Sequence, residues 1–142
     1  MNKQFKIIVL ILCSVCLWNS DLSANLRPSP EMVYSPDSSL LAVAYMKQIR
    51  LYESQTLTEI NGLQGNAFVS SVAFSPDSRL LAWGDHDRLI HLWDVVASRE
   101  VAVLQWLPAA HIELIVFNGD GIILTAAGNG GIRQWDLVTQ QE

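Results

Sequence analysis

The chain has 142 residues and a formal net charge of −5; half of the residues are apolar and 16% are charged. This composition is typical of one globular domain and excludes an intrinsically disordered chain. The acidic balance argues against a nucleic-acid-binding protein, because the arginines are scattered and no basic cluster would neutralise a run of phosphates.

Residues 1–24 predict an N-terminal signal helix, that is, a secretory signal peptide. Lys3 and Lys6 precede the apolar run Ile7–Trp18, and a cleavage site is expected after Ala24. The run is too short to span a hydrocarbon core comfortably, for which about 20 residues are needed, so a cleaved signal is favoured and an uncleaved anchor is the alternative. Both cysteines lie in this segment, so a mature domain of residues 25–142 would carry no thiol. It would lie outside the cytoplasm, secreted or periplasmic.

The rest of the sequence repeats every 41 to 42 residues. Three segments align, and in each of them the third apolar run ends in an aromatic residue. A fixed period in this range indicates stacked supersecondary units, none of which buries its own hydrophobic face. The segments start at Tyr34, Phe74 and Phe117, and their aromatic residues are Tyr52, Trp93 and Trp135.

Each unit has the same order of turns and short β-prone runs. Ser35–Ser38 and Ser75–Ser78 predict type I turns, and Asn118–Gly121 predicts the equivalent turn in the third unit. Four short antiparallel strands per unit describe a propeller blade. The expected strands are Met32–Tyr34, Leu40–Tyr45, Ile49–Tyr52 and Leu57–Ile60; then Val69–Phe74, Leu80–Trp83, Leu89–Trp93 and Glu100–Leu104; then Leu114–Phe117, Ile122–Ala127 and Ile132–Trp135.

The middle unit resembles a WD repeat through Phe74-Ser75-Pro76-Asp77, Leu80-Leu81-Ala82 and Leu92-Trp93-Asp94. The resemblance covers about residues 31–142, as three degenerate repeats. It implies an all-β fold, a partial β-propeller of about three four-stranded antiparallel WD-like blades. The blades are expected at about 31–62, 68–107 and 112–142. Because a propeller needs about 4–8 blades, we expect a fragment of a longer protein, a remnant, or one arc of an oligomeric ring.

The resemblance also implies structural residues in each repeat, since the family often ties a blade with hydrogen-bonded His, Ser or Thr, Asp and Trp. No unit carries the whole set: the positions typical of Asp hold Met46, Asp87 and Asn129. Apolar packing is therefore expected to dominate blade stability. The residues expected to have structural roles are Asp87, Trp93, Asp94, Thr125, Asn129, Trp135 and Asp136.

The densest group of metal-ligand side chains is Asp85-His86-Asp87 with His91. We expect Asp85, His86 and Asp87 to lie in the turn between two strands and His91 to lie on a strand, rather than to bind a metal, because zinc needs three or four convergent ligands and calcium needs more. His111 has no nearby nucleophile, and no Gly-x-Ser-x-Gly motif is present. The sequence therefore predicts no catalytic residue, no metal and no cofactor.

The expected function is a non-enzymatic, exported WD-repeat scaffold that presents blade edges and loops to a protein partner, or to further blades or copies that complete the propeller. We expect neither nucleic acid nor membrane as a partner after signal cleavage. His86 and Trp106 are the candidate partner contacts; Trp106 is either an exposed anchor or packs between blades. The alternative is a fragment of a longer propeller with a hydrolase activity encoded beyond residue 142, or a non-functional remnant.

Overall fold

The computed structural model describes residues 30–106, 110–139 and 141. These residues form eleven β-strands in three separate antiparallel sheets. No helix among them is long and apolar enough to cross a membrane. The expected signal helix of residues 1–24 lies outside the described residues.

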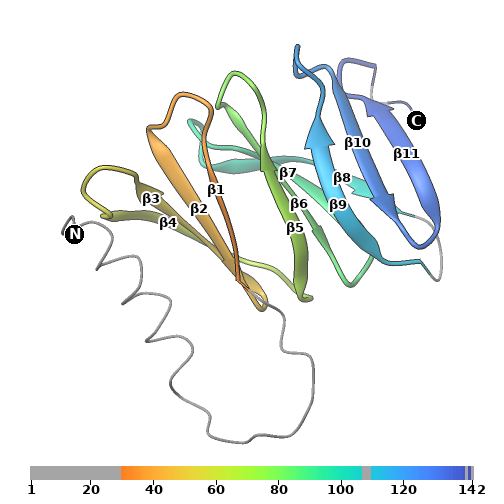
Figure 1. Ribbon diagram of the computed structural model, residues 1–142, viewed down its shortest axis with the longest axis horizontal. Coiled ribbons are helices and arrows are strands. Elements are labelled where there is room, and N and C mark those ends of the chain that lie inside the picture. Colours follow the sequence, from red (N-terminus) through yellow and green to blue (C-terminus); the bar gives the residue numbers. More distant parts are fainter. Residues whose placement is uncertain (1–29, 107–109, 140, 142) are drawn as a thin grey trace, which may run out of the picture.

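The three sheets stand side by side and form an arc (Figure 1). In each sheet the strands pair in sequence order, as expected for propeller blades. The first sheet contains β1 (Glu31–Tyr34), β2 (Leu40–Tyr45), β3 (Gln48–Glu53) and β4 (Glu59–Gln64). The second contains β5 (Val69–Phe74), β6 (Leu80–Asp85), β7 (Leu89–Asp94) and β8 (Arg99–Gln105). The third contains β9 (Ile112–Phe117), β10 (Ile123–Gly128) and β11 (Gly131–Asp136).

The described strands agree in number with those expected from the sequence, four in each of the first two units and three in the third. Among the described residues the third sheet has three strands, and β11 has no neighbour along its outer edge except at one bridge. This bridge pairs Asp136 with Gln141, in the position where Asp94 pairs with Arg99 in the second sheet.

The prediction for the fourth strand of the first unit was wrong in position. The strand was expected at Leu57–Ile60, but β4 runs from Glu59 to Gln64. Leu57 has a φ of 54° and its N–H donates to the carbonyl of Glu53 at 2.8 Å, so this apolar residue belongs to the turn. Its side-chain type suggested a strand, but its left-handed backbone conformation does not fit one.

The first turn of each sheet is closed by a hydrogen bond between its first and fourth residues, which confirms the three predicted turns. The bonds run from Ser38 N to Ser35 O at 2.8 Å, from Ser78 N to Ser75 O at 2.9 Å and from Gly121 N to Asn118 O at 3.0 Å. In the first turn, hydrogen bonds from the Ser35 hydroxyl and then the Ser39 N–H lower the pKa of Asp37 to about 2.

The hydrophobic core lies between the sheets. The second strand of the middle sheet is covered on both faces, because Leu81 packs toward the first sheet and Ala82 toward the third. Hydrogen bonds between the sheets add to this packing. The Val72 N–H donates to Glu31 Oε2 at 2.9 Å, and the Ile115 N–H donates to Ser71 Oγ at 3.2 Å.

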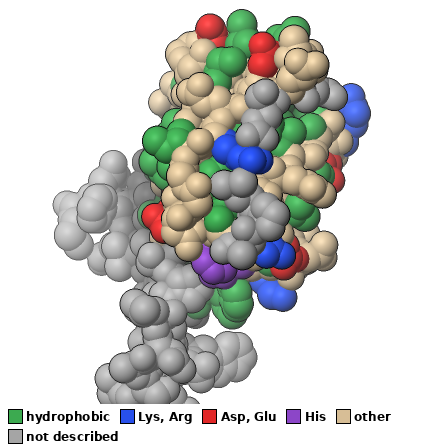
Figure 2. Space-filling model, turned by 90° about the vertical axis from the view of Figure 1, so that its right-hand side faces the viewer, with side chains coloured by type: hydrophobic (Ala, Val, Ile, Leu, Met, Phe, Trp, Pro, Cys, Tyr) green, Lys and Arg blue, Asp and Glu red, His purple; other side chains and the backbone are tan. Residues whose placement is uncertain are grey.

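The two outermost faces of the arc carry exposed apolar side chains, since no further described sheet covers them. On the first sheet Tyr34 is 50% exposed, and on the third sheet Ile132 is 73% exposed. Figure 2 views the molecule from the third sheet and shows hydrophobic side chains in green, scattered among polar atoms. Gln134 and Thr125 also form a hydrogen bond on this sheet, from Gln134 Nε2 to Thr125 Oγ1 at 3.1 Å.

Candidate functional site

One end of the arc brings together loops from all three sheets. The β2–β3, β6–β7 and β10–β11 turns lie at this end, which is the lower edge in Figure 1. Because the strands are antiparallel, the β4–β5 and β8–β9 connections lie there too. We call this end the loop end.

Four side chains form a continuous row across the loop end, and we call them the loop-end row. The Lys47 ammonium lies 5.8 Å from the centre of the Phe68 ring. The Phe68 ring lies edge-on to the His86 ring at 5.8 Å, and the His86 and His111 rings are 5.6 Å apart. Figure 2 shows histidine atoms, purple, near the lower edge of the coloured part of the molecule. The four residues come from four different connections, so the row exists only when the sheets pack side by side.

Backbone hydrogen bonds fix the loops that carry the row. The His86 N–H donates to the Phe68 carbonyl at 2.9 Å, which extends the β5–β6 pairing of the second sheet, and the Val69 N–H donates to the Met46 carbonyl at 2.7 Å, which joins this loop to the first sheet. The His111 N–H donates to Asn129 Oδ1 at 2.7 Å, so Asn129 ties the β10–β11 turn to the row. Lys47 Nζ donates to the Asn66 carbonyl at 2.8 Å. The row is therefore held in place before any partner binds.

A second cluster of polar side chains crosses the middle sheet. His91 on β7 lies between two carboxylates: Nε2 is 3.2 Å from Asp85 Oδ2, and Nδ1 is 2.6 Å from Glu100 Oε1. Asp85 is 1% exposed, and its other oxygen accepts the N–H groups of Asp87 at 2.9 Å and Leu89 at 3.2 Å. The Trp83 ring stacks on the imidazole at 4.8 Å.

The charged form of His91 is favoured by this cluster. Burial lowers the pKa of His91, but the hydrogen bonds and negative charges of Asp85 and Glu100 outweigh burial and raise it above its usual value. Both ring nitrogens face a carboxylate, which only the doubly protonated imidazole satisfies. The cluster borders a groove of about 330 Å³ between β4 and the middle sheet, lined also by Trp93.

The four residues considered as metal ligands, Asp85, His86, Asp87 and His91, do not lie together in the structure. Asp85 and His91 meet inside the middle sheet, whereas His86 belongs to the loop-end row. Asp87 is exposed on the turn and donates its N–H to Asp85. Within residues 30–106 and 110–139, no three His, Cys, Asp or Glu side chains gather in a way that suits a metal ion.

The other residues with expected structural roles lie at strand ends and in the sheets. Asp94 Oδ1 accepts the N–H of Ala97 at 2.8 Å, and Asp136 Oδ1 accepts those of Val138 at 2.8 Å and Thr139 at 2.9 Å. Each aspartate thus stabilises the turn that follows the third strand of its own sheet. Trp93 is half-buried on β7, and Trp135 is 4% exposed on β11.

Trp106 lies in the core between the second and third sheets. Its side chain is 4% exposed, and its ring centre is 6.1 Å from that of Trp135. This position corresponds to packing between blades, the second of the two roles considered for it. A direct anchor for a partner would require this ring to leave the core.

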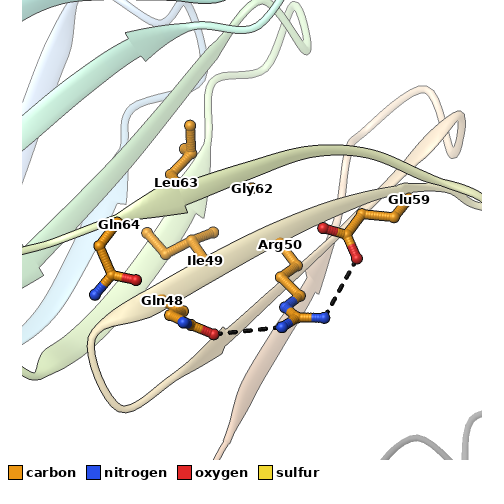
Figure 3. Close-up of a pocket in the computed structure, with 7 residues that line it drawn as sticks. All are labelled: Gln48, Ile49, Arg50, Glu59, Gly62, Leu63 and Gln64. Atoms are coloured by element: carbon orange, nitrogen blue, oxygen red, sulfur yellow. Dashed lines mark hydrogen bonds and ion pairs between the residues drawn. The ribbon is translucent and has the colours of Figure 1, made fainter.

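A shallow pocket on the first sheet contains an ion pair (Figure 3). Arg50 Nη1 lies 3.3 Å from Glu59 Oε2, and both side chains are substantially exposed. The pocket volume is about 160 Å³, below the range of about 300–1,000 Å³ that is typical of small-molecule sites. It lacks a buried polar group that would orient a ligand.

Sequence reasoning missed Phe68 and Lys47 in the row and Glu100 in the cluster. The alternation of β6 and β7 contains a signal for the cluster, since Trp83 and Asp85 share one face of a strand. The row had no comparable signal. Its members come from loops, and the sequence alone does not show that these loops meet.

The repeated sheet has the strand order of a β-propeller blade, and comparison with known proteins shows which repeat it resembles. Residues 56–94 match the family described as WD domain, G-beta repeat. This segment contains β4 and the first three strands of the middle sheet. Residues 56–94 thus match a WD repeat, and the resemblance to WD-repeat proteins is confirmed.

Several proteins are similar to this chain, among them the following three. Target of rapamycin complex subunit wat1 of Schizosaccharomyces pombe is 26% identical over 89% of this chain and 39% of its own length. Small ribosomal subunit protein RACK1 of the same organism is 37% identical over 53% of this chain and 23% of its own length. Topless-related protein 4 of Arabidopsis thaliana is 29% identical over 95% of this chain and 13% of its own length. The chain thus spans less than two fifths of each of these relatives.

Proposed function

We propose that this chain is a non-enzymatic WD-repeat arc that binds a protein partner through its loop end. The observation that carries the proposal is the loop-end row, in which side chains from all three sheets form one fixed surface. Aromatic side chains with locked positions favour binding, because little conformational entropy is lost. The names of two relatives, a subunit of a target of rapamycin complex and a small ribosomal subunit protein, place those proteins in assemblies.

Site-specific photo-crosslinking tests this proposal. A benzophenone amino acid at His86 is expected to yield discrete adducts with a partner in extracts of the source cells. The same group at Val96, which is 78% exposed on the β7–β8 turn at the opposite end, should yield none of them. Adducts of the same mass and strength from both positions, or from neither, would contradict a binding surface at the loop end.

We further propose that the chain is exported by its N-terminal segment. The basic start with Lys3 and Lys6, the apolar run Ile7–Trp18 and the small residue Ala24 support a cleaved signal peptide. N-terminal sequencing of the protein from fractionated cells is expected to start at Asn25 in the extracytoplasmic fraction. A cytoplasmic protein that begins at Met1 would contradict export and leave the binding proposal intact.

A further inference from the structure

We infer that the two outermost faces of the arc bind each other between two copies of this chain, so that two arcs close one ring. The outer face of the third sheet of each copy packs on the outer face of the first sheet of the other copy. This inference goes beyond the proposed function, because it concerns the two sides of the arc and not its loop end.

The outer face of the third sheet exposes a residue whose equivalents are buried in the other two sheets. Ile49, Ile90 and Ile132 are each the second residue of the third strand of their sheet. Ile49 is 2% exposed and Ile90 is 0% exposed, because each packs against the sheet that follows it. Ile132 is 73% exposed. Leu114 and Val116 of β9 are exposed as well, so this face of the third sheet carries three large apolar side chains.

The outer face of the first sheet shows the same change on the other side of the contact. Tyr34 ends β1 as Phe74 ends β5, yet Tyr34 is 50% exposed and Phe74 is 7% exposed. Met32, two residues before Tyr34, is 42% exposed. Its equivalents Val72 and Ile115 are 4% and 2% exposed, because each packs against the sheet that precedes it.

The two outer faces are therefore the two halves of one kind of contact, which the chain already forms twice. Ile49 belongs to the half that covers the second sheet, and Ile90 to the half that covers the third. One copy carries an unused first half on its third sheet and an unused second half on its first sheet. A second copy thus supplies the complement of each face. Such a contact is heterologous, and heterologous contacts form a ring when the rotation closes.

The number of sheets selects two copies. The described residues of one copy supply three sheets, and two copies supply twice three, which is six. Propellers contain about 4–8 blades, so one copy has too few sheets and three copies would have too many. Both junctions of a ring of two copies are alike, because each joins a third sheet to a first sheet.

The polar groups on the two faces have partners within their own sheets. Gln134 Nε2 donates to Thr125 Oγ1 at 3.1 Å on the outer face of the third sheet. Arg50 shares the outer face of the first sheet with Met32, since both pair with one residue of β2, and Arg50 is ion-paired with Glu59 at 3.3 Å. Covering the faces therefore leaves no polar group without a partner, which limits the cost of burial. Because these groups make the faces less apolar than the inner contacts, we expect a dimer that dissociates on dilution.

Sedimentation equilibrium of the purified full chain over a range of concentrations tests the inference. We expect the mass of two chains at high concentration and a fall toward the mass of one chain on dilution. Ile132→Asp and Tyr34→Asp should each raise the dissociation constant of the dimer at least about tenfold, since each places a charge at the centre of a junction. Both side chains are largely exposed in the single arc, so circular dichroism should show that the variants keep the fold.

Mixing the two variants gives a sharper test. An Ile132→Asp copy keeps an unchanged first sheet, and a Tyr34→Asp copy keeps an unchanged third sheet, so one junction is restored. The mixture should therefore form more dimer than either variant alone. Val96→Asp is the matched control, because Val96 is exposed on the β7–β8 turn of the middle sheet and lies on neither outer face. This variant should dimerise like the unchanged chain.

A chain that has the mass of one copy up to about 0.1 mM would overturn the inference, since its outer faces would then be covered in another way or stay free. Assemblies that keep growing with concentration would overturn the closed ring. A dimer that Ile132→Asp or Tyr34→Asp leaves intact would overturn it too, because another surface, the apolar run Ile7–Trp18 included, would then join the copies. A mixture with no more dimer than its separate variants would exclude a contact between third and first sheets. None of these results bears on partner binding at the loop end.

Discussion

The variant Gly128→Ala is expected to lose about 3 kcal/mol of unfolding free energy, or not to accumulate as folded protein. A Cβ at Gly128 would lie 1.9 Å from the carbonyl oxygen of His111 and 3.0 Å from its carbonyl carbon. Both atoms belong to the backbone, so no rotamer change relieves the overlap. The start of β9 would have to move away from β10, at the point where the pairing register already shifts.

Urea unfolding followed by circular dichroism measures the loss, and Gly119→Ala is the matched control. A Cβ at Gly119 meets no atom within 4 Å. The control should therefore change the unfolding free energy by about 0.5 kcal/mol or less. Equal stabilities for the two variants would show that the approach of β9 to β10 is not as close as the structure indicates. Because His111 lies at this contact, Gly128→Ala should also weaken binding at the loop-end row.

The fold was predictable from the sequence wherever local chemistry decides it. The turn at Ser75–Ser78 combines Ser, Pro and Asp at the positions that a type I turn prefers, and the strands on each side follow at fixed distances. The fourth strand of the first sheet was misplaced because Leu57 adopts a left-handed conformation that its side chain disfavours. Tertiary context overrides propensity at such a residue, and no local pattern reveals it.

The candidate site was far less predictable, since it depends on which segments meet. His86 was identified as a contact residue from its place beside Asp87 on the turn. Its neighbours Phe68 and His111 come from connections before and after the middle sheet, and only the packing of the sheets brings the rings together. Likewise, the sequence places Asp85 in a turn and His91 on a strand, but Asp85 ends β6, and strand pairing brings the two side chains together inside the sheet.

The pairing of His91 with two carboxylates predicts that the stability of the arc depends on pH. The pKa of His91 is raised in the folded state, so the folded protein binds this proton more tightly than the unfolded chain. The stabilisation is therefore complete below the unfolded pKa of about 6.5 and is lost as the pH rises through the higher folded value. The unfolding free energy should be larger at about pH 6 than at about pH 9.

The variant His91→Gln should remove this pH-dependent part and lower the unfolding free energy by about 2 kcal/mol at about pH 6, since it removes charged hydrogen bonds from a buried carboxylate. Asp85 is only 1% exposed. The glutamine amide can donate a hydrogen bond to its carboxylate but brings no positive charge. His111→Gln is the control, because that ring is exposed and carries no carboxylate partner among the described residues.

Urea titrations at both pH values, with NMR titration of the His91 ring, measure the effect. A His91 ring that titrates below about pH 6.5, or a His91→Gln variant that keeps the full pH dependence, would show that the two carboxylates do not hold the proton on this histidine.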